Sequence, residues 1–343
     1  MKLTTREIAF LAKDFPKKTD ISLFANINEP LDGSEERNLT DKGIYKDGKL
    51  TGEAKKILEI VANAKRCTRL ILRDGLIYVE KYTYKVDDKI VMAENDAGEM
   101  VFSIPDNFNK TIYEVSEFIG MSKIKTADIE ILLSADEMLV ILAMVDIYRK
   151  KVLLTYQGQG ISGETITLAD ISKQLEKPAP NSLVQMLKKN YKYTEPEEGK
   201  VKEIMESLIA KECAISEDGY VLTSEYAIFA KNFLIPETII MIENFNLNKN
   251  NEMVVAGGLG VCAGIKDNLT FIFGINEIEL TSASGFQMLQ MIENFLKCPE
   301  IIEEETDIVE ETPALPANKF CAECGTKIVS GAAFCANCGK KVK

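Results

Sequence analysis

The chain has 343 residues, of which 46% are hydrophobic, a formal net charge of -12 at pH 7 and no histidine. The missing histidine excludes Ser-His and Cys-His nucleophile pairs and every mixed Cys/His metal site. The negative charge disfavours nonspecific attraction to nucleic acids and to anionic membranes. No clustered motif of carboxylates or lysines replaces the missing base, so we expect a protein that is not an enzyme, with about two domains and a short tail.

The first half of the body is predicted at residues 1-125 and begins with a helix start. Thr4 and Glu7 are spaced as a capping box ahead of apolar residues. An Asp-Gly pair at 47-48 then predicts a tight hairpin turn. The remaining elements of this half are expected in the order helix 54-64, strands 69-73, 89-92 and 100-104, and a closing helix that ends near Phe118.

The second half is predicted at residues 130-297 and repeats this order. Ser134 and Glu137 form a second capping box, and Asp218-Gly219 a second hairpin turn. Its later elements are expected in the order helix 226-233, strands 238-242, 252-255 and 271-275, and a closing helix that ends near Phe295. The shared order predicts an α+β body of two related halves, each with a small antiparallel sheet and helices on one face.

An insertion in the second half has the element order of a winged helix. Helices are expected at 167-175, 182-187 and 201-211, ahead of the second hairpin. A DNA reader would offer lysine or arginine from the last helix and from the wing. Here Lys202 and Lys211 stand beside three glutamates, and the wing is acidic, with the residues Ser216, Glu217, Asp218 and Gly219. We therefore expect this segment to contact protein or to serve as scaffold, ahead of nucleic-acid binding.

Two apolar stretches have both a structural and a functional interpretation. The glycine-rich residues 256-264 would hold a phosphate only if they opened a helix, but a strand is expected next, so we predict a hairpin or bulge. The methionine-rich helix 285-296 could form an adaptable partner groove, yet its spacing favours core packing. The scattered cysteines are predicted to be buried free thiols, at Cys67, Cys213, Cys262 and Cys298.

Residues 299-318 are acidic and interrupted by prolines, which predicts a flexible linker. The tail that follows, residues 319-343, has the opposite sign because it carries Lys319, Lys327, Lys340, Lys341 and Lys343. We expect the tail either to fold back or to meet an acidic partner.

Four cysteines in the tail are spaced as C-x2-C, ten residues, C-x2-C. Zn²⁺ takes four thiolates as a tetrahedron, and this spacing brings two such pairs to one ion. We predict a structural zinc site with the ligands Cys321, Cys324, Cys335 and Cys338. A disulfide pair and a redox C-x2-C are the rival interpretations, whereas catalytic zinc would need an open coordination position. Metal binding would supply most of the folding free energy of so short a tail, about 10–16 kcal/mol in comparable sites.

The start of the chain shows no apolar signal region, and no run of about 18 apolar residues follows it. We therefore expect a cytoplasmic protein without membrane insertion. Disulfides are rare in that compartment, which favours zinc over a cysteine pair in the tail.

Two resemblances to known families follow from these patterns. The doubled Phe-Cys-x-x-Cys-Gly at 320-325 and 334-339 resembles the zinc-ribbon family often found at the ends of bacterial proteins, over residues 319-343. In element order alone, the body resembles the chaperones associated with ESX (type VII) secretion, although a zinc tail departs from that family. This second resemblance implies a cytosolic, non-enzymatic chaperone that keeps helical-hairpin secretion substrates soluble, with no binding residue assigned.

Three functional hypotheses remain. The first is a protein-binding adaptor whose ribbon is a second contact on a flexible arm, because two linked weak contacts reinforce each other. The alternative is a transcription-related or nucleic-acid-binding factor that uses the winged-helix-like segment and the basic ribbon, with binding that weakens steeply in salt. An enzyme of unrecognised type would need its scattered Asp, Glu and Lys residues to converge in one deep pocket.

Overall fold

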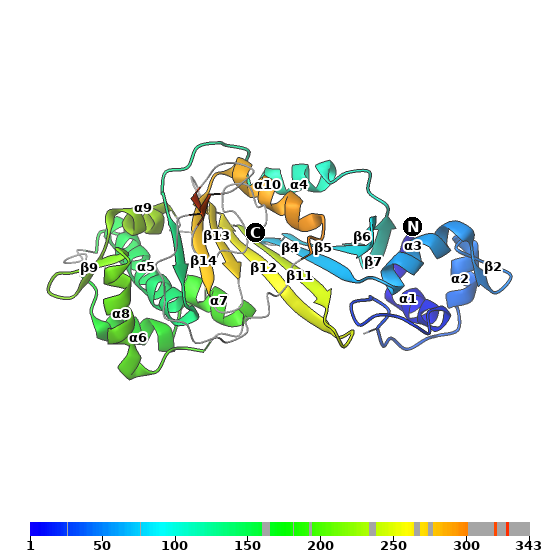
Figure 1. The fold of residues 1–343 in the computed structure, drawn as a ribbon, viewed down its shortest axis with the longest axis horizontal. Coiled ribbons are helices and arrows are strands. Elements are labelled where there is room, and N and C mark those ends of the chain that lie inside the picture. The colour runs from blue at the N-terminus through cyan, green and yellow to red at the C-terminus, as the bar shows by residue number, and fades with distance from the viewer. Residues whose placement is uncertain are drawn as a thin grey trace. The chain divides into compact units, whose positions relative to one another are not determined.

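The computed structural model describes residues 1-25, 27-75, 77-159, 165-180, 182-191, 194-232, 238-263, 268-273, 277-300, 319-320 and 327-328. In this part of the chain, helices combine with antiparallel strands, which confirms the predicted α+β class (Figure 1). Close contacts divide the chain into unit 1, Met1–Val115, Ile240–Leu259 and Gln290–Ala314, and unit 2, Ser116–Ile239, Gly260–Leu289 and Leu315–Lys343. Unit 1 takes segments from both predicted halves, so the boundaries 1-125 and 130-297 stay a prediction about a sequence repeat.

Unit 1 begins with short helices around a hairpin. Strand β1 (Lys2–Thr4) leads into α1 (Thr5–Leu11), and the predicted capping box of Thr4 and Glu7 is present. The hairpin of β2 (Tyr45–Lys46) and β3 (Lys49–Leu50) turns at Asp47 and Gly48, whose φ angles of 52° and 72° suit a tight two-residue turn. The other helical elements are η1 (Ala12–Asp14), α2 (Glu35–Asp41), α3 (Gly52–Ala62) and α4 (Asn109–Ile119).

The sheet of unit 1 has the strand order β1-β7-β6-β5-β4-β11-β12. Its further strands are β4 (Arg66–Asp74), β5 (Ile77–Val86), β6 (Lys89–Asp96), β7 (Glu99–Ser103), β11 (Thr238–Leu247) and β12 (Met253–Ala263). Helix α3 packs against β5 and β6 (Figure 1). Leu58, Tyr84 and Phe102 are buried in this core, which covers one end of one sheet face.

The sequence predicts three strands in the meander of unit 1, and the structure has four. The sequence did not predict strand β5, because charged and aromatic residues interrupt the apolar pattern along it. Its Lys81 is only 4% exposed, because it pairs with Glu94 at 2.8 Å and with Glu114. A buried lysine is compatible with a strand core only when such partners neutralise its charge.

Unit 2 is built around α5 (Ala135–Tyr156), which begins with the predicted capping box of Ser134 and Glu137. Four helices pack against α5 (Figure 1), namely α6 (Leu168–Glu176), α7 (Leu183–Tyr191), α8 (Val201–Ala210) and α9 (Ser224–Asn232). The connection between α7 and α8 includes the short η2 (Glu198–Lys200). The hairpin of β9 (Ala214–Ser216) and β10 (Tyr220–Leu222) turns at the predicted Asp218-Gly219, and Tyr220 also bridges antiparallel to Ile166.

The strands of unit 2 run in the order β13-β14-β8, all antiparallel. They are β8 (Glu130–Leu133), β13 (Asn268–Phe273) and β14 (Ile278–Ala283), of which the sequence predicted only β13. The methionine-rich helix is α10 (Gly285–Leu296), and Met288 and Met291 are fully buried in it, which confirms the core interpretation.

Three other predictions concern the glycine-rich stretch, the scattered cysteines and the linker. Residues 256-263 of the glycine-rich stretch lie in β12, so they continue a strand and do not open a helix. Cys67, Cys213 and Cys298 are buried free thiols, as predicted. The side chain of Cys262 and most of the linker 299-318 lie outside the described residues.

Candidate functional site

The predicted zinc ligands Cys321, Cys324, Cys335 and Cys338 lie outside the described residues. The strands that flank the first pair are described: β15 (Lys319–Phe320) runs antiparallel to β16 (Lys327–Ile328), with Phe320 opposite Lys327. Four thiolates form a donor set that suits tetrahedral zinc without an open position. Within the described residues, no group of three or more histidine, cysteine or acidic side chains could hold a metal ion.

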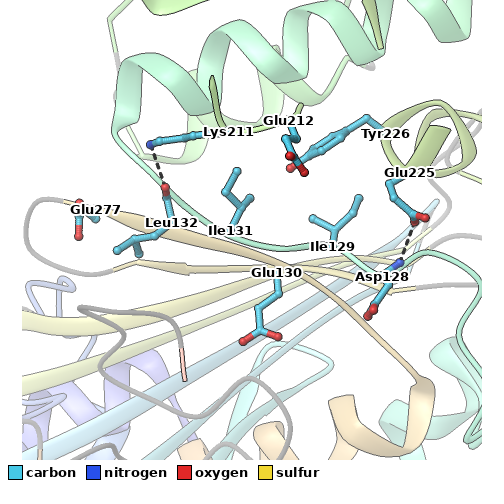
Figure 2. Close-up of a pocket in the computed structure, with 10 residues that line it drawn as sticks. All are labelled: Asp128, Ile129, Glu130, Ile131, Leu132, Lys211, Glu212, Glu225, Tyr226 and Glu277. Atoms are coloured by element: carbon cyan, nitrogen blue, oxygen red, sulfur yellow. Dashed lines mark hydrogen bonds between the residues drawn. The ribbon is translucent and has the colours of Figure 1, made fainter. Parts of the chain in front are cut away.

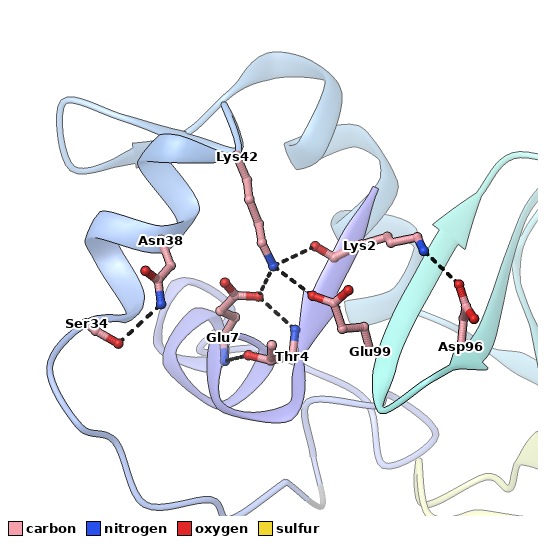
Figure 3. A network of polar contacts seen from close by, with 8 residues as sticks. All are labelled: Lys2, Thr4, Glu7, Ser34, Asn38, Lys42, Asp96 and Glu99. Atoms are coloured by element: carbon pink, nitrogen blue, oxygen red, sulfur yellow. Dashed lines mark hydrogen bonds and ion pairs between the residues drawn. The ribbon is translucent and has the colours of Figure 1, made fainter.

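A buried carboxylate secures the start of α1 in unit 1 (Figure 3). Glu7 is 2% exposed, and its Oε2 accepts hydrogen bonds from the Thr4 N–H at 2.7 Å and from Lys42 Nζ at 2.8 Å. Lys42 Nζ also donates to the Lys2 carbonyl at 3.3 Å and pairs with Glu99 at 3.2 Å. Burial disfavours the charged amine, but these two carboxylates outweigh it and raise the pKa of Lys42.

The start of α5 in unit 2 has the same arrangement. Glu137 Oε2 accepts hydrogen bonds from the Ser134 N–H at 2.7 Å and from Lys211 Nζ at 2.8 Å. Lys211 Nζ also donates to the Leu132 carbonyl at 3.1 Å, two residues before the capping serine, as Lys2 is two residues before Thr4. Burial alone would raise the pKa of Glu137, but hydrogen bonds from Lys211 and Ser207 lower it. We name these two arrangements the capping locks.

A pocket of about 740 Å³ lies beside the second capping lock (Figure 2). Residues 128-132, which lead into β8, form one wall, and Ile129 and Ile131 point from them toward the opposite wall. Among the described residues, the lining holds one lysine and five carboxylates, with the lining residues Asp128, Ile129, Glu130, Ile131, Leu132, Lys211, Glu212, Glu225, Tyr226 and Glu277. We name it the acidic groove. No pair of its side chains forms the nucleophile and base of a recognisable catalytic site.

An open surface lies on the sheet of unit 1, on the face that α3 covers but beyond the core. Cross-strand register places Arg69 opposite Tyr82, Ile71 opposite Glu80 and Arg73 opposite Tyr78, so these alternate residues share one face. Along β12, Met253 and Val255 alternate outward and are 44% and 63% exposed.

The register of the β11–β12 hairpin places the outward residues of β12 on this same face of the sheet. A hydrogen bond of 2.9 Å from the Asn248 N–H to the Glu252 carbonyl closes the hairpin. Met253 therefore faces Leu247, and Val255 faces Phe245, on the side where Arg69 meets Glu243. We name this surface the sheet-face patch; it consists of Ile71, Tyr78, Tyr82, Met253 and Val255.

A fixed charge cluster lies within the sheet-face patch. The Arg69 guanidinium bonds Glu80 at 2.7 Å and Glu243 at 3.3 Å, and the Tyr82 hydroxyl donates to Glu80 at 2.7 Å. Burial works against the charge of Arg69, but Tyr82 and both carboxylates raise its pKa. Tyr78, 57% exposed, projects beside this cluster. Sequence patterns did not predict the patch, because its members come from three separate stretches of the chain.

The acidic character of the winged-helix-like segment persists in the structure. Glu203 and Glu206 are exposed on α8, as is Lys202. Lys211, which follows the end of α8, is held by Glu137 in the capping lock. Helix α8 and the acidic wing therefore offer little positive charge to phosphates.

Glu279 on β14 is a buried acid that the sequence did not reveal. It is 3% exposed, and its Oε2 has no hydrogen-bond partner in the part of the chain that the structure describes. Burial, followed by the nearby Glu130, raises the pKa of Glu279 to about 8. Near pH 7 the group is therefore mostly protonated.

Comparison with known proteins finds both resemblances that the sequence suggested. Residues 320-342 match the zinc-ribbon domain family. The chain is similar to the Mycobacterium tuberculosis type VII secretion system chaperone EspG5, solved in complex with the PE25-PPE41 dimer, at 8% identity and a TM-score of 0.47, covering 87% of this chain and 94% of that one. No curated protein matches the sequence. No helix in the described part of the chain is long and apolar enough to cross a membrane.

Proposed function

We propose that this protein is a non-enzymatic, chaperone-like adaptor that binds another protein through the sheet-face patch, with its zinc ribbon as a second contact. The observation that carries the proposal is the combination of exposed apolar side chains and a fixed charge cluster on one sheet face. Single exposed apolar residues are ordinary on protein surfaces, but several on one face of a sheet, beside ordered polar groups, are typical of interaction sites.

The sheet-face patch is ready to bind without rearrangement. Tyr78 and Val255 lie on ordered strands, so little conformational entropy is lost when a partner covers them. Arg69 is already oriented by Glu80 and Glu243, and its position would favour one orientation of a polar partner group. A helix that lays an apolar stripe across the strands would bury these side chains, so a helical partner fits this surface.

The ribbon's role rests on zinc. We propose that Cys321, Cys324, Cys335 and Cys338 hold one zinc ion, which folds the tail. The ligand spacing and the family match at 320-342 support this assignment. The linker 299-318 would keep the folded ribbon within reach of a partner bound at the sheet-face patch, so that the two contacts act together.

We also propose that the two predicted halves are related and that α6 to β10 form a winged-helix-like element. The capping locks support the first proposal, because Thr4, Glu7 and Lys42 have counterparts in Ser134, Glu137 and Lys211 with the same bonding pattern. The antiparallel bridge of Ile166 to Tyr220 supports the second, because it adds a third strand position beside the wing hairpin.

The test is affinity capture from the native cytoplasm with the intact chain and three matched variants. The double change Tyr78→Glu and Val255→Lys should reduce recovery of the partner about tenfold, as expected when central contacts are lost. The control is Tyr156→Glu, a 76% exposed aromatic at the end of α5, which should leave recovery unchanged. A chain ending at residue 298 should bind more weakly than the intact protein but retain the same partner.

The same experiment separates the alternative function. Nuclease treatment of half of each sample should change nothing if the partner is a protein. Loss of the captured material with nuclease, together with a steep decrease in binding with salt, would favour a nucleic-acid-binding factor. The identity of the captured protein decides whether the role is associated with secretion. Equal recovery by the patch variant and the intact chain would contradict the proposal.

A further inference from the structure

The acidic groove in unit 2 carries charge that the rest of the described structure does not neutralise. Lys211 is the one cation among its described lining residues, and that charge is already paired with Glu137 outside the groove lining. Asp128 pairs with Lys125 at 2.7 Å. The side chains of Glu212 and Glu277 have no ionic or hydrogen-bond partner among the described residues, and Glu225 accepts only the Asp128 N–H at 3.1 Å.

The groove also has an apolar floor. Ile129 and Tyr226 are 2% and 6% exposed, and Ile131 points into the space between β8 and the opposite wall (Figure 2). Glu130 points to the other side of the strand, away from this space. An occupant that suits the groove therefore needs positive charge at its edges and some apolar surface between.

One segment of the chain has this chemistry. Residues 319-343 contain the five lysines Lys319, Lys327, Lys340, Lys341 and Lys343 against the single acid Glu323, together with Phe320 and Phe334. A zinc ion held by four thiolates adds a net charge of about -2, which the lysines still outweigh. The ribbon is thus a cationic body with apolar surface.

We infer that the acidic groove is the docking site of this chain's own zinc ribbon. The inference rests on the proposed zinc-folded ribbon and adds the surface that the ribbon occupies when no partner is bound. The linker at 301-318 can span at most about 60 Å, which allows the ribbon to search the surface of its own chain. Tethering holds the ribbon at an effective concentration in the mM range, so a weak charged contact suffices.

Docking in the groove gives the adaptor a resting state. Lys340 and Lys341 meet Glu212 and Glu277, and the ribbon is released when salt or a more acidic partner surface competes for its lysines. The linker is itself acidic, with Glu303, Glu304, Glu305, Asp307, Glu310 and Glu311, and competes for the same lysines. The groove differs from the linker in offering fixed carboxylates around an apolar floor.

The test is zero-length carbodiimide cross-linking of the full, zinc-loaded chain at low micromolar concentration, read by mass spectrometry. Lysine-to-carboxylate links should join Lys340 or Lys341 to Glu212 or Glu277 at low salt. The double change Glu212→Lys and Glu277→Lys should reduce them at least about tenfold. The matched control, Glu203→Lys with Glu206→Lys on α8, changes the net charge equally outside the groove and should leave them in place.

A charge swap makes the test specific. Adding Lys340→Glu and Lys341→Glu to the groove reversal should restore protection of β8 against hydrogen exchange, whereas each double variant alone should lose it. Links only to the linker, links that increase with protein concentration, or links unaffected by the groove reversal would overturn the inference. Zinc content and capture through the sheet-face patch are measured separately, so failure of the docking does not mimic failure of the proposed function.

Discussion

The two capping locks hold a buried glutamate at the start of a helix in the same way, but they differ in the number of hydrogen-bond donors to that glutamate. Glu7 and Glu137 each close a capping box and each accept a hydrogen bond from a lysine 2.8 Å away. In unit 1 the lysine also serves Glu99, while in unit 2 the carboxylate has a further donor, the Ser207 hydroxyl at 2.6 Å. Lys42 is therefore the main side-chain donor that stabilises the Glu7 carboxylate in unit 1. In unit 2 both Lys211 and Ser207 stabilise the Glu137 carboxylate.

The comparison shows that local sequence dictates the cap but not its third partner. Thr4 with Glu7 and Ser134 with Glu137 lie three residues apart and form the same helix start. Their lysines come from positions 35 and 74 residues away. Glu279 is the contrasting case, a buried glutamate with no such lysine among the described residues.

The largest expected effect is that zinc removal unfolds the tail and leaves both capped units folded. Chelation of zinc, or Cys→Ser at all four ligands, should unfold residues 319-343, because about 10–16 kcal/mol of folding free energy comes from the metal in such sites. The units should keep their melting temperature, since their cores are made of ordinary apolar residues. Tryptic cleavage at Lys327 and Lys340 should accelerate on chelation. Less than about half an equivalent of zinc in the purified chain would contradict the assignment.

The next largest effect is the pH-dependent change in stability caused by the buried Glu279. Because the folded pKa of Glu279 is raised to about 8, the folded state holds its proton more tightly than the unfolded state does. The stability that this proton linkage contributes is fully present below the unfolded-state pKa of Glu279 and is lost as the pH rises toward 8. Glu279→Gln should therefore stabilise the protein by roughly 3–5 kcal/mol at pH 9 and change little at pH 4. Denaturant unfolding at both pH values, with the exposed Glu277→Gln as control, measures the difference.

A smaller difference distinguishes the two lysines. Lys42→Met leaves Glu7 buried with only the Thr4 N–H, and should cost about 2–3 kcal/mol. Lys211→Met leaves Glu137 with the Ser207 hydroxyl and the Ser134 N–H, and should cost about 1 kcal/mol. Chemical denaturation of the two variants side by side gives the comparison directly. The reverse order would show that the third partner does not matter.

The smallest effect sharpens the same contrast. Ser207→Ala removes the hydroxyl donor from Glu137 while Lys211 remains, and should cost about 0.5–1.5 kcal/mol. Combined with Lys211→Met, the loss should exceed the sum of the single changes, because the carboxylate then keeps only its backbone donor. Strict additivity in this double-mutant cycle would mean that Ser207 and Lys211 stabilise Glu137 independently of each other.

Local signals account for most of what the sequence predicted correctly. The capping boxes, both Asp-Gly turns and the buried α10 follow from short patterns and were found in place. Strands β5 and β14 were missed because Lys81 and Glu279 interrupt their apolar alternation. Burial of those two residues depends on the fold around them. The sheet-face patch and the acidic groove join distant segments, and no local pattern encodes such a meeting.

The central claim is that a protein partner covers the sheet-face patch. The most direct measurement places a photo-cross-linking amino acid at position 255 in living cells, with the same group at position 156 as control. We expect one discrete cross-linked protein from position 255 and none from position 156. Equal products from both positions, or a product from position 156 alone, would contradict it.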